Sequence, residues 1–193
     1  MKNYYYLILL LIFSSEIFSQ ETEFKFNNQT GMTDFIVTKV ENKTASELFK
    51  KTIEWIKITY KNPDKVILST IENEYIRFEG SSDILYSINV LGRTYLPTKY
   101  QIEISFKEGR YKFDLISMQN YNSPSQYTSG GWTENGFFNG NLPKESIDMV
   151  FKKDGSLKGT WKYLPDVPVY FNTLNKSLFD YVISNNKKDD TDW

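Results

Sequence analysis

The chain has no histidine and no cysteine, so many of the side chains that carry out enzyme chemistry are missing. A Ser-His-Asp or Cys-His nucleophile cannot be assembled, and a zinc site would have to use carboxylates alone, which is rare. The segment GSLKGT at Gly155–Thr160 lacks the spacing and the lysine position of a phosphate-binding loop, and no segment has the ligand spacing of a calcium loop. We therefore expect no cofactor and no bound metal.

Carboxylates are the remaining route to catalysis. A pair of carboxyl groups that hydrolyses a sugar polymer meets in space rather than in sequence, so the sequence alone cannot select one. Glu72 and Glu74 lie close together, but at an expected turn tip, where solvated carboxylates are ordinary. A carboxylate-dependent enzyme acting on glycans is thus the alternative to the favoured interpretation, a non-catalytic binding or interaction module.

One long segment, Gln119 to Pro143, has the composition of a binding loop. It shows no hydrophobic period and is rich in Asn, Ser and Gly. Aromatic rings among small polar residues are typical of recognition loops, and long loops are commonly functional. The candidate binding residues are its rings, Tyr121, Tyr127, Trp132, Phe137 and Phe138. The competing interpretation is that Trp132 and Phe137 fold back to cover a sheet edge or the open face, because most large aromatic side chains are buried.

An amphipathic helix is predicted over Thr44 to Pro63. Thr44 followed by Glu47 forms a capping-box pattern, and Pro63 cannot continue a helix. Apolar residues centred on Trp55 recur at helical spacing, which indicates that one face is buried in a core.

Strands surround this helix. Phe35 to Val40 is β-branched, and the segments on either side of Glu72–Glu74 form an expected hairpin. Residues 84–91 are either a further strand or a continuation of the preceding one past a bend at Gly80. A two-residue turn at Glu108 and Gly109 joins two strands whose apolar residues alternate, with Ile102, Ile104 and Phe106 inward on the first and Tyr111, Phe113 and Leu115 on the second.

Two further elements complete the fold. Ser146 to Tyr163 is predicted as a hairpin turning at Lys153–Ser156, and Pro168 to Ser184 as a second helix. A one-sided sheet needs a covering layer. The predicted class is therefore α+β: a curved antiparallel sheet with two helices on one face, in the order β-α-β4-α.

The runs EWIKITYKNPDKVI (Glu54 to Ile67) and ISFKEGRYKFDLI (Ile104 to Ile116) resemble the domain of unknown function 4468 family. The resemblance covers roughly Phe35 to Met118 and the last helix. It implies a small exported bacterial protein with a TBP-like fold. The shared motifs bear on the fold and not on catalysis, so no functional residues are carried over, and a TBP-like fold does not by itself imply DNA binding.

The first nineteen residues resemble a secretory signal peptide, with Lys2 before an apolar run and small residues near Ser19. This predicts an exported protein, periplasmic or extracellular, with no transmembrane segment in the mature chain. The organisation is a signal peptide at 1–19, a single domain at 20–185 and a polar tail at 186–193. The net charge of −1 disfavours nucleic acid as a partner. The sequence does not identify the partner, and the candidates for an exported protein are an envelope protein, a peptide or a glycan.

Overall fold

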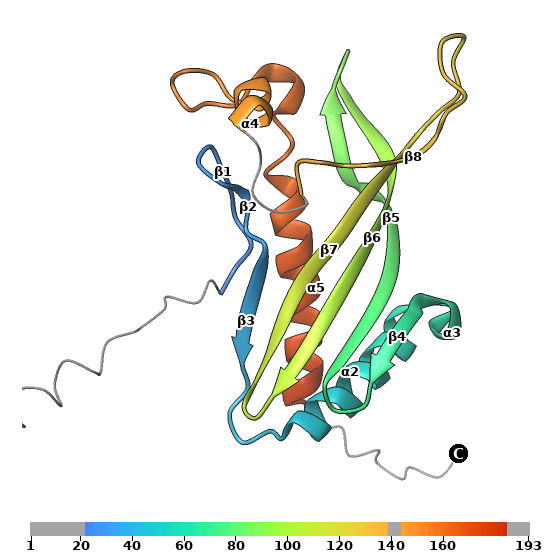
Figure 1. The fold of residues 1–193 in the computed structure, drawn as a ribbon, viewed down its shortest axis with the longest axis vertical. Helices are drawn as coiled ribbons and strands as arrows, with labels where there is room; N and C mark the ends of the chain where they lie inside the picture. The colour runs from blue at the N-terminus through green and yellow to red at the C-terminus, as the bar shows by residue number, and fades with distance from the viewer. Residues whose placement is uncertain (1–21, 139–143, 185–193) are drawn as a thin grey trace, which may run out of the picture.

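The computed structural model describes residues 22–138 and 144–184, so the predicted leader and polar tail lie outside the described residues. The main sheet has six strands, paired antiparallel in the order β3-β7-β6-β5-β4, with β8 pairing with β7 (Figure 1). The strands are β3 Phe35–Lys39, β4 Ile67–Ile71, β5 Tyr75–Asn89, β6 Arg93–Lys107, β7 Arg110–Asn122 and β8 Gly131–Glu134. The predicted antiparallel sheet is confirmed.

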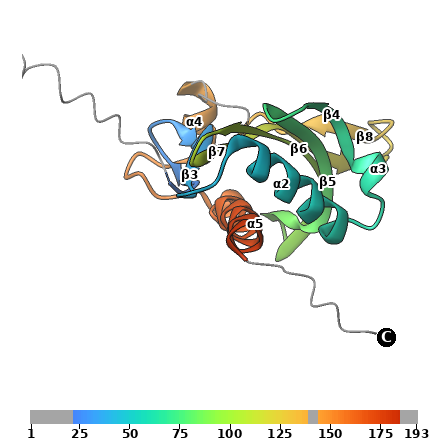
Figure 2. The same ribbon diagram turned by 90° about the horizontal axis from the view of Figure 1, so that it is seen from below.

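Two helices, α2 Ala45–Thr59 and α5 Asp166–Ile183, lie on the same side of this sheet (Figure 2). Trp55 of α2 and Leu178 of α5 are both buried in the core between the layers. The indole Nε1 of Trp55 also donates a hydrogen bond to Ser177 Oγ at 3.1 Å, which joins the two helices directly. The predicted β-α-β4-α order and the shared helical core are confirmed.

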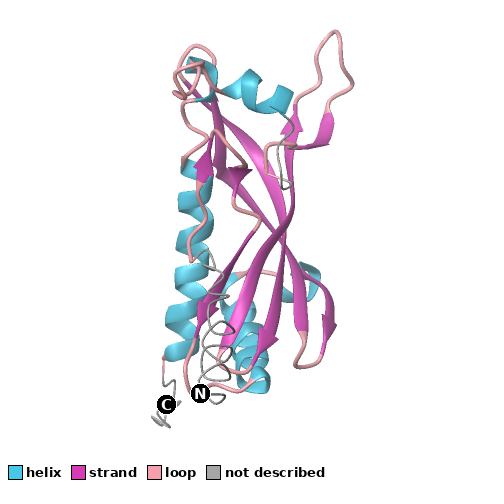
Figure 3. Cartoon of the chain, turned by 60° about the vertical axis from the view of Figure 1, so that its left-hand side comes forward, coloured by secondary structure: helices cyan, strands magenta, loops and turns pink. Residues whose placement is uncertain are grey.

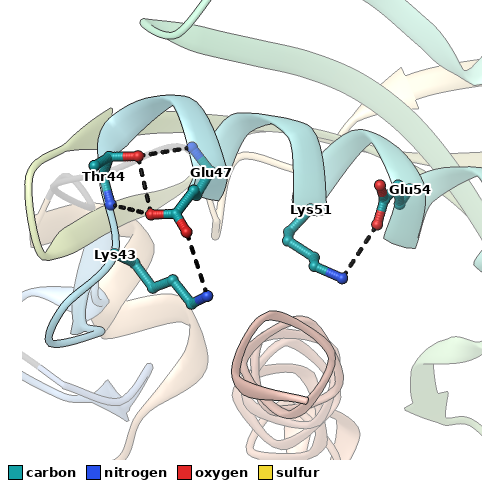
Figure 4. A network of polar contacts seen from close by, with 5 residues as sticks. All are labelled: Lys43, Thr44, Glu47, Lys51 and Glu54. Atoms are coloured by element: carbon teal, nitrogen blue, oxygen red, sulfur yellow. Dashed lines mark hydrogen bonds and ion pairs between the residues drawn. The ribbon is translucent and has the colours of Figure 1, made fainter. Parts of the chain in front are cut away.

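The start of α2 follows from its sequence. Thr44 Oγ1 accepts the backbone N–H of Glu47 at 3.1 Å, and Glu47 Oε2 accepts the backbone N–H of Thr44 at 2.8 Å (Figure 4). This is the predicted capping box, which satisfies two donors that a helix start leaves unpaired. The helix ends at Thr59, and Pro63 begins a separate short helix, α3 Pro63–Val66, where its missing N–H costs nothing.

The two long strands β6 and β7 form the predicted hairpin. Glu108 and Gly109 make the turn, and Gly109 has the positive φ of +69° that the turn requires. The predicted inward residues of both arms are buried, and their polar neighbours form the opposite, open face of the sheet. Strand β5 runs through Gly80 without interruption, so residues 84–89 continue that strand rather than starting another.

The prediction of a hairpin over Ser146 to Tyr163 is wrong. The first arm is a helix, α4 Lys144–Val150, and the second contains a short 3-10 helix, η1 Gly159–Trp161. Ile147 is half-buried and Val150 is buried, a spacing of three that fits a helix, whereas Met149 is exposed. A short apolar run does not separate the two patterns. The predicted turn does form, because Phe151 and Leu157 pair across it in an isolated bridge.

The remaining elements lie at the edge of the fold. The lead-in before β3 forms a small hairpin of β1 Phe26–Asn27 and β2 Gly31–Met32.

Among the described helices, none has both the length and the apolar character needed to cross a membrane.

Candidate functional site

Residues 119–134 of the predicted binding segment form a β-hairpin rather than an irregular loop, and residues 139–143 of that segment lie outside the described residues. Its first residues end β7, its central residues 123–130 project beyond the sheet, and β8 returns alongside β7 (Figures 1 and 3). Gly130 closes the projecting part: its φ is +71°, and a Cβ there would lie 2.7 Å from Asn122 O and 2.6 Å from Pro124 N. Only glycine allows this close approach of the two arms.

Two of the five candidate rings meet on this hairpin. Tyr121 of β7 and Trp132 of β8 are direct cross-strand partners, and their ring centroids are 5.4 Å apart in an edge-to-face arrangement. The Nζ of Lys99, on the next strand β6, lies 4.5 Å from the centroid of the Trp132 ring. We call Lys99, Tyr121 and Trp132 the ring surface. It belongs to the open face of the sheet, because the neighbouring residues Thr98, Asn120 and Tyr100 are buried on the helical side.

The ring surface remains accessible. Trp132 is 40% exposed and Tyr121 is half-buried, so part of each ring faces solvent. Tyr127 lies apart from them at the tip of the hairpin, where it is 86% exposed. An exposed pair of fixed aromatic rings beside a cation can stack against a sugar ring or against an apolar or aromatic peptide side chain.

A buried polar chain holds β8 in place below the ring surface. Asn135 Nδ2 donates to Asn120 Oδ1 at 2.6 Å, and Asn120 Nδ2 donates to Thr98 Oγ1 at 2.7 Å. The backbone N–H of Asn135 also donates to Met118 O at 2.7 Å. Burial raises the pKa of the adjacent Tyr86 to about 12, against an opposing hydrogen bond with Asn135. These buried bonds fix the strand that carries Trp132, since an unpaired amide here would be costly.

The other two candidate rings are part of the scaffold. Phe138 is 2% exposed and packs against Phe26 and Tyr86, with centroids 5.8 and 6.1 Å away. Phe137 is partly buried with its ring 5.0 Å from that of Trp161. The prediction of five rings in one binding segment is corrected for Phe138, because a side chain buried this deeply presents no surface to a partner. Its contacts anchor the segment after β8.

Sequence reasoning missed Lys99. It lies on β6, far from Trp132 in the chain, and comes close to it only because β6 and β8 flank β7. No local pattern in the sequence carries that relationship.

The described residues contain no group of three or more Asp or Glu side chains placed to bind a metal ion. The pKa of Glu47 is lowered by hydrogen bonds from Thr44, and that of Asp154 by hydrogen bonds from Ser156. A carboxyl group acting as a general acid needs the opposite shift.

Comparison with known proteins agrees with the fold. Residues 36–121 match the family model described as "Domain of unknown function (DUF4468) with TBP-like fold". No curated protein matches the chain.

Two crystal structures resemble this one. A DUF4468 family protein from Bacteroides ovatus ATCC 8483 is 12% identical, with a TM-score of 0.58 over 89% of this chain and 95% of that one. A TBP-like protein from Parabacteroides distasonis ATCC 8503 is 14% identical, with a TM-score of 0.51 over 77% of this chain and 90% of the other. At these identities the likeness concerns the fold alone. The resemblance of this chain to the DUF4468 family, with its TBP-like fold, is therefore confirmed, and it centres on residues 36–121.

Proposed function

We propose that the protein is an exported envelope protein that acts as a non-catalytic binding module and uses the ring surface to bind an envelope glycan or peptide. The observation that carries the proposal is the edge-to-face pair of Tyr121 and Trp132. Trp132 is 40% exposed, and the buried hydrogen bond between Asn135 and Asn120 fixes the strand that carries it. Interface energy concentrates in a few rigid aromatic side chains, and Trp and Tyr are the commonest of these.

The rigidity of the pair supports this role. Tyr121 lies at the end of a long central strand, and Trp132 is held in register by β8 and by the buried Asn120–Asn135 bond. A ring that is already ordered loses little conformational freedom when a ligand binds, so more of the contact energy appears as affinity.

A binding screen tests the proposal. The full chain is tested against arrays of envelope glycans and peptides, alongside Trp132→Ala. Phe35→Ala is the matched control, because Phe35 is 43% exposed and has Lys112 Nζ 5.1 Å from its ring centroid. Phe35 opposes Asp114 and Trp132 opposes Tyr121, so the two rings lie roughly 20 Å apart along β7.

The expected result is a ligand that binds wild type and Phe35→Ala equally and binds Trp132→Ala at least about tenfold more weakly, the loss typical of an anchor residue. If Trp132→Ala binds the ligand as tightly as wild type does, the ring surface is not the binding site.

Export is a separate part of the proposal and is supported by the sequence of residues 1–19. The mature protein is expected to begin near Gln20 and to be found in the periplasm or outside the cell. An N-terminal mass measurement on the protein from each cell fraction tests this, and an intact Met1 in the cytoplasmic fraction would contradict it.

A further inference from the structure

A second feature of the open sheet face lies at the opposite end from the ring surface. Where β6 turns into β7, the surface has a hollow of about 250 Å³, lined by Val37, Ser105, Lys107, Arg110, Tyr111 and Lys112. Three of these six residues carry a positive charge. We call this feature the basic hollow.

Strand register concentrates further positive charge beside it. Arg110 is the direct cross-strand partner of Lys107 on one side and of Lys39 on the other. Three cations therefore stand in one row across β3, β7 and β6. Like charges directly opposite each other destabilise a sheet, so this row weakens the fold unless something negative lies on it.

The nearby carboxylates are engaged with partners other than Lys39, Lys107 and Arg110, and one of them, Asp114, pairs with Lys112 of the hollow itself. Asp114 lies 2.6 Å from Lys112, Glu103 lies 2.7 Å from Arg77, and Glu108 accepts the backbone N–H of Ala45 at 3.1 Å. Within residues 22–138 and 144–184, no carboxylate forms an ion pair with Lys39, Lys107 or Arg110. The row is thus left with a positive excess that the described part of the chain does not neutralise.

The chemistry of the lining defines the ligand class. An Arg guanidinium and a Lys ammonium bind carboxylate, sulfate and phosphate groups, and Arg can do so with two parallel hydrogen bonds. The Ser105 hydroxyl is a further donor, and Val37 supplies an apolar wall. Ligand sites of drug size start at about 300 Å³, so a hollow of this size suits a group no larger than one ring.

The surrounding face limits the length of the ligand. The next positions along the sheet carry Glu103 on β6 and Asp114 on β7, which are direct partners of one another. A long polyanion lying along the face would meet these carboxylates, so a single anionic group fits better than an extended nucleic acid.

From these observations we infer that the basic hollow binds an oxyanion, either carboxylate, sulfate or phosphate, carried on a body about the size of one sugar ring. The anion is held by Lys107 and Arg110, with Lys39 adding charge, and the body lies against Val37. Lys112 is already paired with Asp114 and adds little net charge. This inference does not rest on the ring surface or on the role proposed for it.

An NMR titration of the full chain tests this inference. The probes are glucuronate, glucose 6-sulfate, glucose 6-phosphate and inorganic phosphate, with glucose as the neutral control. At least one of the three charged sugars should shift the amide signals of Lys39, Ser105 and Arg110 saturably, and its affinity should fall as salt is added. Comparing the three identifies the preferred anion.

Charge-removing variants distinguish specific binding in the basic hollow from a general attraction of anions to the protein's positive charges. Lys107→Gln with Arg110→Gln should weaken binding by about tenfold or more, since charge-assisted bonds are lost. Lys57→Gln with Lys61→Gln removes the same charge from α2 and the residues after it, and should leave binding unchanged. The first variant should also melt at the same temperature as wild type or higher, because it relieves the repulsion in the row.

Three outcomes would overturn the inference: no saturable shift with any charged sugar, equal binding of glucose, or equal loss in the Lys57 and Lys61 variant. Inorganic phosphate that binds as tightly as glucose 6-phosphate would overturn the role given to Val37. Equal ligand binding by wild type and Trp132→Ala in the glycan and peptide screen, which would contradict the role proposed for the ring surface, would leave this result untouched, so the two proposals fail independently.

Discussion

The ring of Tyr100 lies directly against the backbone of Gly80, its cross-strand partner in β5. A Cβ built on Gly80 would lie 2.3 Å from Cζ of that ring. The Tyr100 hydroxyl also lies 3.2 Å from the hydroxyls of both Tyr60, at the end of α2, and Tyr170 of α5. Because Gly80 has no side chain, the Tyr100 ring has room to lie across β5 and to contact Tyr60 and Tyr170.

Gly80→Ala should destabilise the protein by about 1–3 kcal/mol, because the new methyl group overpacks the core against a fixed ring. Urea unfolding measures the change. Gly136→Ala is the control, since a Cβ at Gly136 meets no atom within 4 Å and its expected effect is within about 0.5 kcal/mol. Equal unfolding midpoints for the two variants would contradict the close contact between Gly80 and the Tyr100 ring.

The buried tyrosines predict a loss of stability at alkaline pH. Burial raises the pKa of Tyr86 from 10.0 to about 12 and raises those of Tyr60, Tyr100 and Tyr111 further. Above pH 10 the unfolded chain loses these protons while the folded chain keeps them, so the free energy of unfolding falls as the pH rises. Each such tyrosine contributes at most about 1.4 kcal/mol per pH unit.

Urea unfolding at a series of pH values from 8 to above 10 measures this slope. Below pH 10 the tyrosines should contribute no slope, and above it Tyr100→Phe should lose stability less steeply than wild type. The same slope in both proteins would show that the buried hydroxyl of Tyr100 is not responsible.

The fold could be predicted because its strongest signals are local. The Thr44–Glu47 capping box and the turn at Gly109 each place two neighbouring segments without any knowledge of the rest of the chain. The residues around Ile147 and Met149 were misassigned because a seven-residue helix and a strand share the same short apolar pattern. Tertiary packing selects the helix for this segment, because the helical conformation buries Val150 in the core.

The candidate sites could be predicted only in part. The composition of residues 119–143 drew attention to Tyr121 and Trp132, but their pairing depends on the register of β8 on β7. The basic hollow was not predicted at all. Lys39, Arg110 and Lys107 come from three strands, and a net charge of −1 for the whole chain conceals such a local excess.

Trp55→Ala should destabilise the protein by roughly 3–5 kcal/mol, because it leaves a large cavity between α2, α5 and the sheet. Trp55 is 1% exposed and packs edge-on against Phe78, with centroids 6.0 Å apart. Ser177→Ala removes only the hydrogen bond to the indole and should cost about 1 kcal/mol or less. Thermal and urea unfolding of both variants compare the two contributions, and a wild-type midpoint for Trp55→Ala would contradict the shared helical core.

Gly130→Ala should disturb the projecting hairpin and leave the core intact. The substitution places a methyl group 2.7 Å from Asn122 O and demands a positive φ that alanine adopts only at a cost. Asn122 and Thr133, which are joined by a 2.7 Å hydrogen bond, would have to separate, and Trp132 lies beside Thr133. The expected result is a shift of the NMR signals of residues 121–134 with little change in those of α2 and α5.

The neighbouring change Ser129→Ala is the control, because Ser129 is exposed and should leave both sets of signals in place. A different outcome is that Gly130→Ala lowers the stability of the whole domain as much as Trp55→Ala does. The hairpin would then be part of the cooperative core. Trp132 would in that case be held by the fold as a whole, and not by a separable element that presents the ring surface.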